Sequence, residues 1–195
     1  MKRFLDIVFS FFGLLLLSPF LLSIAFLVML DSKGPVFYRQ LRVGKNSIDF
    51  GLLKFRTMRI GADKLGLLTV GNRDPRITKV GYVLRKYKLD EFPQLWNVLI
   101  GEMSMIGPRP EVRKYVNLYN SNQKIVLSVK PGITDWASIK YRNESEVLSN
   151  ADDPEKAYVE VVMPEKLKLN LLFINQPTVF NYFRILFSTF LSILK

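Results

Sequence analysis

The chain has 195 residues, of which 49% are hydrophobic, and 28 Lys and Arg against 17 Asp and Glu give a formal net charge of +11. This length suffices for one domain with a hydrophobic core and is short for two. The sequence contains no Cys and no His, which excludes disulfides, Cys-ligated metals, and thiolate or imidazole catalysis. Chemistry must therefore use carboxylates, hydroxyls, amines or a hard metal ion held by oxygen, for which Mg²⁺ is the natural candidate. The excess of cations calls for an anionic partner, such as lipid headgroups, nucleotide phosphates or nucleic acid.

The first predicted element is an apolar helix from Phe4 to Leu30, which is long enough to cross a bilayer. Two cations precede it and three follow it closely, so the positive-inside rule places both of its ends in the cytoplasm. At its middle stand Ser18 and Pro19, and a proline there removes a backbone donor and clashes with the preceding turn, although a neighbouring serine can compensate the freed backbone groups. We therefore predict a re-entrant helix-break-helix over residues 1–31, with a plain transmembrane anchor as the alternative.

Next come two predicted strands and a loop. A short β-like run lies between Gly34 and Gly44, and a second strand runs from Asp49 to Met58. Lys54 and Arg56 share a face of that second strand, because side chains two residues apart point the same way. Residues 61–75, which contain the sequence GNRDP, predict a surface loop.

A helix is predicted around LRKYKLDEFPQLWNVL, because its apolar residues recur at helical spacing. Asp90 and Glu91 directly precede Pro93, a residue favoured in the first turn of a helix, so both carboxylates are expected at a helix start. Residues 101–110 predict turns, 111–127 a helix, and 129–139 a turn leading into a strand. The acidic stretch at 144–160 is interpreted as a solvated face.

The C-terminal stretch from Val179 to Lys195 is rich in Phe and Leu but contains polar interruptions, and it is short for a membrane span. We predict an amphipathic helix lying in the membrane interface, with a core helix as the alternative. The expected fold class is α+β: a re-entrant membrane helix (1–31), a cytoplasmic catalytic domain with helices and a small sheet (32–177) and an interfacial helix (178–195), all parts of one domain.

By itself, an acidic pair before a helix is explained as a helix cap. In a phosphate site, however, two adjacent carboxylates repel the substrate unless a cation intervenes or one of them attacks phosphorus. A carboxylate can form an acyl-phosphate, and a second can hold the Mg²⁺ that spreads charge on the transferred group. Asp90 and Glu91 are therefore candidates for both tasks.

Cations surround this pair in the sequence. Arg85 lies just upstream, Lys54 and Arg56 belong to the predicted strand, and Arg109 is fixed between two prolines. Guanidinium groups and the free N–H groups of a helix start both match phosphate oxygens. The prolines limit the backbone freedom of Arg109, which suits substrate positioning and is equally typical of a structural turn.

Several long motifs occur in one order along nearly the whole chain: GPVFYRQ, KFRTM, LDEFPQLWNVLIGEMSMIGPRPE, and KPGIT followed by Trp136 and Ala137. With them, the chain resembles the bacterial sugar transferase family of small monotopic phosphoglycosyl transferases, which begin glycan assembly on undecaprenyl phosphate. The resemblance implies transfer of a sugar-1-phosphate from a nucleotide sugar, with a UDP-linked donor as first choice, to undecaprenyl phosphate. It also implies a place on the cytoplasmic face of the bacterial inner membrane, at the first membrane step of exopolysaccharide, capsule, O-antigen or glycoprotein glycan synthesis.

The same resemblance implies roles for individual residues in a ping-pong reaction. Asp90 is the nucleophile that releases a nucleoside monophosphate, and Glu91, beside Asp90, helps to bind Mg²⁺. The implied phosphate and nucleotide contacts are Lys54, Arg56, Arg85, Pro108, Arg109 and Pro110, and Ser18 with Pro19 form the membrane break.

The chain also departs from the family pattern. A late acidic residue of many members falls on Leu169 or Asn170, a second one falls on Asn181, and Asp135 stands where glycine is common. We expect these changes to bear on sugar specificity and not on the acidic pair.

Two other classes of function are weighed against this one. A non-catalytic, basic, membrane-associated module that binds lipid or nucleic acid would share the charge and the apolar helix. However, nucleic-acid binders spread cations with stacking aromatics over a face, whereas these cations gather around a carboxylate pair, so no nucleic-acid partner is expected. An inactive scaffold is disfavoured by the intact acidic pair. The sugar, the glycan pathway and the formation of homo-oligomers stay open.

Overall fold

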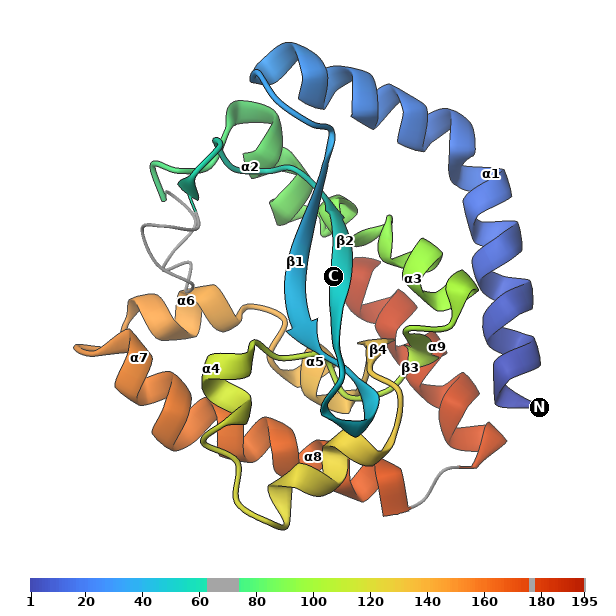
Figure 1. Ribbon diagram of the computed structural model, residues 1–195, viewed down its shortest axis with the longest axis vertical. Coiled ribbons are helices and arrows are strands. Elements are labelled where there is room, and N and C mark those ends of the chain that lie inside the picture. Colours follow the sequence, from blue (N-terminus) through green and yellow to red (C-terminus); the bar gives the residue numbers. More distant parts are fainter. Residues whose placement is uncertain (63–73, 176–177, 195) are drawn as a thin grey trace.

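The computed structural model describes residues 1–62, 74–175 and 178–194 (Figure 1). Most of the predicted loop at 61–75 lies outside these residues. The α helices are α1 (Lys2–Asp31), α2 (Lys79–Lys86), α3 (Gln94–Ile100), α4 (Arg113–Val116), α5 (Trp136–Lys140), α6 (Glu144–Ser149), α7 (Pro154–Ala157), α8 (Met163–Asn175) and α9 (Val179–Leu194). Shorter helical turns are η1 (Lys45–Ser47), η3 (Leu89–Glu91), η4 (Gln123–Ser128) and the π-helical η5 (Tyr158–Val162). The strands are β1 (Phe37–Val43), β2 (Asp49–Phe55), β3 (Ser104–Ile106) and β4 (Gly132–Thr134). The predicted mixture of helices with small sheets is confirmed.

Helix α1 is continuous from Lys2 to Asp31, so the predicted break at Ser18 and Pro19 is not seen. Instead, the helix axis turns near its middle, and α1 arches along one side of the molecule (Figure 1). Proline lacks the N–H that would bond the carbonyl of Leu15, and the hydroxyl of Ser18 donates to that oxygen at 2.8 Å. Serine thus compensates the donor that proline lacks, which allows a bend without a break. By length and composition, α1 is also a candidate for a membrane-crossing helix.

Both ends of α1 are bonded to the rest of the protein. Near the start, Asp6 is buried and accepts hydrogen bonds from the backbone of Met105 and from the hydroxyls of Ser104 and Tyr182. At the far end, the carboxylate of Asp31 accepts from the amide of Val80 in α2. The bent helix is therefore fixed to one domain at both ends.

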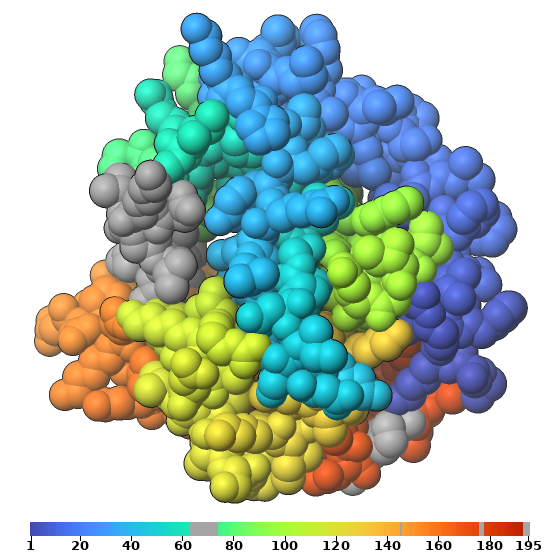
Figure 2. All heavy atoms as spheres, viewed as in Figure 1, coloured from blue at the N-terminus to red at the C-terminus, as the bar shows by residue number. Residues whose placement is uncertain are grey.

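Strands β1 and β2 form an antiparallel hairpin, in which Tyr38 pairs with Lys54. The hairpin lies on the outside of the molecule, between the region of α4 and helix α3 (Figure 2). Asn97 of α3 ties the two elements together, because its amide accepts from the backbone of Leu53 and donates to the carbonyl of Gly51. This contact fixes β2 against α3.

Strands β3 and β4 form a short parallel pair. Their backbones approach so closely beyond Ile106 that a Cβ on Gly132 would lie 2.0 Å from the amide nitrogen of Gly107. The amide of Gly132 also donates to the carbonyl of Pro108 at 2.9 Å. Glycine is required here, and the close approach positions the segment that begins at Pro108.

The largest cluster of buried apolar side chains lies between the end of β1, the α4 to η4 segment and α8. The helix predicted over 111–127 is wrong in extent, since only α4 and η4 are helical there. Asn120 and Gln123 exchange side-chain to backbone hydrogen bonds, each at 2.9 Å, and this local turn competes with a continuous helix.

Helix α9 confirms the predicted C-terminal helix, and part of it is buried as the core-helix alternative expects. Tyr182 and Ile185 are fully buried, whereas Phe180, Phe187 and Phe190 are exposed. One face of α9 therefore packs on the core, and its other apolar face is exposed.

Candidate active site

The acidic pair lies in the η3 turn directly before α3, as the sequence predicts. The turn is entered through Lys88, which adopts a left-handed conformation with φ of 58°. Such a conformation costs a non-glycine residue about 1 kcal/mol or more, and strain of this kind gathers at functional sites. Among the described residues, no hydrogen bond joins either carboxylate to a backbone N–H of α3. The interpretation of the pair as a helix cap is therefore not supported.

Asp90 is buried, with 7% of its surface exposed, and no hydrogen bond or ion pair from the described residues reaches its carboxylate. Burial and the adjacent charge of Glu91 raise the pKa of Asp90, while the positive charges of Lys54, Arg85 and Lys88 oppose this shift. A buried carboxylate without a hydrogen-bond partner is available as a nucleophile, and the nearby cations favour its ionised form.

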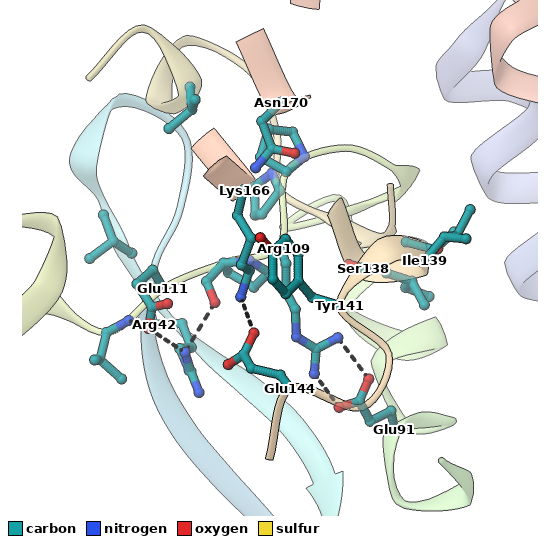
Figure 3. A pocket seen from close by; sticks show the side chains of 18 of the residues that line it. Arg42, Glu91, Arg109, Glu111, Ser138, Ile139, Tyr141, Glu144, Lys166 and Asn170 are labelled. Atoms are coloured by element: carbon teal, nitrogen blue, oxygen red, sulfur yellow. Dashed lines mark hydrogen bonds and ion pairs between the residues drawn. The ribbon is translucent and has the colours of Figure 1, made fainter. Parts of the chain in front are cut away.

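Glu91 is the paired member. Both of its oxygens accept from the guanidinium group of Arg109, one of them at 2.9 Å (Figure 3). The ammonium of Lys54 lies 3.4 Å from one of these oxygens. Although burial alone raises the pKa of Glu91, the charges of Arg109 and Lys54 lower it well below the usual range. Glu91 is therefore ionised, and two adjacent carboxylates thus have opposite pKa shifts.

Hydrogen bonds hold both the backbone and the side chain of Arg109 in place. It stands between Pro108 and Pro110, and its amide donates to the buried carboxylate of Asp135 at 3.3 Å. Asp135 also caps α5 by accepting from the amide of Ser138. At this position, where glycine was expected, the aspartate connects α5 to the proline-flanked arginine.

These residues surround a cavity of about 500 Å³, which is large enough for a nucleotide-sized ligand. The predicted site residues that line it are Lys54, Arg85, Asp90, Glu91, Pro108, Arg109 and Pro110. Leu17 of α1 lines it too, so the cavity extends to the bend of the apolar helix.

Arg56 is placed elsewhere. Its buried guanidinium group donates to the carbonyls of Val28 and Ser32 at the end of α1, and it does not line the cavity. Strand β2 ends at Phe55, short of the predicted end at Met58, so Arg56 lies outside the strand that carries Lys54. Arg56 therefore bonds the free carbonyls at the C-terminal end of α1, and the structure provides no support for the predicted phosphate contact.

Several charged residues that line the cavity were not among the predicted site residues. Lys88 follows α2, and Lys166 of α8 forms an ion pair with Glu144 at 2.7 Å (Figure 3). The interpretation of residues 144–160 as a solvated face is wrong for Glu144, although Glu160 is exposed. Nothing in the sequence distinguished Glu144 from the other acidic residues of this stretch.

The cavity offers carboxylate oxygens, the kind of ligand that Mg²⁺ requires. The described residues contain no group of three acidic side chains placed to hold a metal ion. Asp90 and Glu91 offer two adjacent carboxylates, and Mg²⁺ in phosphate-transferring enzymes is often held by one or two carboxylates together with substrate phosphates and waters. The donor set therefore fits an Mg²⁺ ion that binds together with a diphosphate.

The positions where family acids were expected fall into two groups. Asn170 is buried and lines the cavity, whereas Leu169 and Asn181 do not line it. Of the three, Asn170 is placed to contact a ligand.

Comparison with known proteins agrees with the motifs. The sequence profile described as bacterial sugar transferase matches residues 1–195. The UDP-N-acetylgalactosamine-undecaprenyl-phosphate N-acetylgalactosaminephosphotransferase of Aeromonas hydrophila is 42% identical over 141 residues, which cover 71% of this chain and 33% of that protein. The UDP-glucose:undecaprenyl-phosphate glucose-1-phosphate transferase of Escherichia coli is 41% identical over 160 residues, covering 78% of this chain and 34% of that protein.

A shorter relative is the putative undecaprenyl-phosphate N-acetylgalactosaminyl 1-phosphate transferase of Bacillus subtilis. It is 46% identical over 110 residues, which cover 56% of this chain and 62% of that protein. The matched part of this chain thus corresponds to about a third of the longer relatives. Because the family profile covers the sequence from end to end, the chain belongs to the bacterial sugar transferase family.

Proposed function

We propose that the protein transfers a sugar-1-phosphate from a UDP-linked sugar to undecaprenyl phosphate through a covalent intermediate on Asp90. The observation that carries the proposal is the pairing pattern in the cavity. Asp90 is buried without a partner from the described residues, next to Glu91, which is paired with Arg109 and Lys54. The names of the relatives supply the donor and acceptor classes.

In the first half-reaction, a carboxylate oxygen of Asp90 attacks the phosphorus that bears the sugar. The bond from this phosphorus to the bridging oxygen breaks, and uridine monophosphate leaves with the electron pair. Arg109 and Lys54 hold Glu91 in place, while Arg85 and Lys88 face the charge that develops on the transferred group. Mg²⁺, held by Asp90 and Glu91 with the diphosphate oxygens, would neutralise part of that charge.

In the second half-reaction, an oxygen of the lipid phosphate attacks the same phosphorus. The bond to Asp90 breaks, which regenerates the carboxylate and yields a lipid diphosphate sugar. Leu17, one residue before the Ser18-Pro19 bend, lines the cavity, so a lipid phosphate arriving along α1 would have a direct approach to Asp90.

We also propose that α1 enters and leaves the membrane on the cytoplasmic side. A straight span would place its ends on opposite faces, about 30 Å apart. Here Arg3 donates to carbonyls at the end of α3, and Asp31 accepts from Val80 of the same domain. The exposed apolar side chains of α1 adjoin those of α9 where the rings of Phe9 and Phe183 meet, with centroids 6.5 Å apart. Together the two helices would form the membrane-facing surface, with α9 in the interface.

The activity is tested by incubating purified protein with Mg²⁺ and UDP-sugars, with and without undecaprenyl phosphate. We expect one equivalent of uridine monophosphate without acceptor and continuous release with it, and Asp90→Asn should abolish both. Asp152→Asn, a change at an exposed aspartate, is the matched control. Unchanged release by Asp90→Asn would refute the nucleophile assignment.

The membrane course is tested by labelling single cysteines, which is simple because the natural sequence has none. Lys2→Cys and Lys33→Cys should react with an impermeant reagent from the same side of the membrane. The exposed Lys168→Cys of the soluble part reports which side is cytoplasmic. Labelling of the two helix ends from opposite sides would instead establish a transmembrane span.

A further inference from the structure

The cavity has a second polar region away from the acidic pair, formed by α5 and α8. In Figure 3, Asn170 and Glu91 lie at opposite ends of the view, with Ser138 on a third side. The reaction proposed above gives this region no task.

Two polar groups in this region are buried without a partner. Asn170 has 5% of its surface exposed, and its carboxamide oxygen accepts no hydrogen bond. The hydroxyl of Ser138 is likewise buried and unpaired. Most buried polar groups in folded proteins are hydrogen-bonded, because an unsatisfied one is costly. Two exceptions in this region of the cavity indicate groups that a ligand would satisfy.

The charge of this region differs from that of the acidic end. Lys166 lies one helical turn before Asn170 on α8, and its charge is neutralised by Glu144 at 2.7 Å. The cations that face Asp90 suit a diphosphate, whereas an unpaired carboxamide oxygen and an unpaired hydroxyl suit a neutral, hydroxyl-rich group.

We infer that Asn170 and Ser138 form the subsite for the sugar ring of the donor and set sugar selectivity. The carboxamide oxygen of Asn170 accepts from a sugar hydroxyl or an acetamido N–H, and the hydroxyl of Ser138 bonds a second sugar hydroxyl. This inference rests on the proposed function, since it takes a nucleotide sugar to be the ligand. It assigns the sugar, and not the nucleoside, to the α5 and α8 side of the cavity.

The test compares Asn170→Leu and Ser138→Ala with wild-type protein on four UDP-linked donors: N-acetylgalactosamine, N-acetylglucosamine, galactose and glucose. These sugars differ in the C2 substituent and in the orientation of the C4 hydroxyl. We expect Asn170→Leu to lower kcat/KM for the preferred donor about tenfold and to bring the four values closer together, as loss of one hydrogen bond to the preferred sugar predicts. Inhibition by uridine monophosphate should not change.

Two further variants sharpen the comparison. Asn170→Asp keeps an accepting oxygen and should retain the order of preference among donors. Asn175→Leu, at an exposed position of the same helix, should behave like wild type. Ser138→Ala removes one atom, so it provides a second measurement if Asn170→Leu does not fold.

An unchanged order and spread of kcat/KM values in both Asn170→Leu and Ser138→Ala would overturn the inference. Weaker inhibition by uridine monophosphate, with selectivity intact, would also overturn it by placing the nucleoside here. Donor binding is measured as well on Asp90→Asn protein with and without Asn170→Leu. If wild-type protein releases no monophosphate, the proposed function is wrong. The binding of UDP-sugars to these two proteins still tests the sugar subsite in that case.

Discussion

The pair formed by Glu91 and Arg109 provides a quantitative test of how the site is held together. The side chain of Glu91 is 15% exposed and that of Arg109 is 33% exposed. Removing one partner of a buried ion pair costs about 3–5 kcal/mol when the other charge stays buried, whereas an exposed charge recovers solvation. Arg109→Met leaves Glu91 with Lys54 at 3.4 Å, so we expect a loss of about 3 kcal/mol. Glu91→Gln leaves a partly exposed arginine and should cost about 1 kcal/mol.

For a chain of this size, these losses correspond to thermal midpoints lower by about 6–12 °C and 2–4 °C, respectively. The double variant should lose less than the sum of the two single losses, with a coupling of about 1 kcal/mol or more. Thermal unfolding of detergent-solubilised protein, followed by tryptophan fluorescence, measures all four midpoints. Strictly additive losses, or an unchanged midpoint for Arg109→Met, would refute the view that this pair holds Glu91 beside the nucleophile.

Three further changes test other parts of the account. Because burial and the charge of Glu91 raise the pKa of Asp90, ionisation of this carboxyl group opposes folding. Asp90→Asn should therefore raise the thermal midpoint at pH 7 while it abolishes monophosphate release. The gain in midpoint should shrink as the pH falls through the raised pKa of Asp90. Gly132→Ala forces a contact of 2.0 Å with the backbone and should cost about 2 kcal/mol or more. Gly51→Ala is its control: the Cβ would lie 3.6 Å from the side chain of Arg39, an ordinary contact, so the midpoint should stay near that of wild type. Asp6→Leu removes the acceptor of three hydrogen bonds from β3 and α9 and should cost about 3 kcal/mol, seen as a lower midpoint and faster proteolysis of α9.

Local patterns in the sequence predicted the parts of the fold that local patterns determine. The apolar run predicted α1, two β-like runs predicted β1 and β2, and Pro93 placed the acidic pair directly before α3. The serine before Pro19 was expected to compensate the missing donor, and it does so. The prediction of a helix break at Ser18 and Pro19 was wrong, because the hydrogen bond of Ser18 allows the helix to bend and continue.

The contents of the cavity depend on contacts that are distant in sequence. Nothing local to Glu144 indicated that it would pair with Lys166, and nothing local to Arg56 indicated that α1 would end beside it. Asn170 was noted for its place in a family pattern, but its unpaired oxygen is visible only in the folded protein. Sequence motifs thus located the acidic end of the cavity, and the tertiary structure was required for the rest.

The central claim is that Asp90 carries the sugar phosphate between donor and acceptor. Mass spectrometry of protein mixed with Mg²⁺ and the preferred UDP-sugar, without undecaprenyl phosphate, tests it directly. We predict one sugar-phosphate adduct on the peptide that contains Asp90, absent from Asp90→Asn protein and lost when undecaprenyl phosphate is added. Turnover by protein that forms no adduct, or an adduct on another residue, would contradict the account.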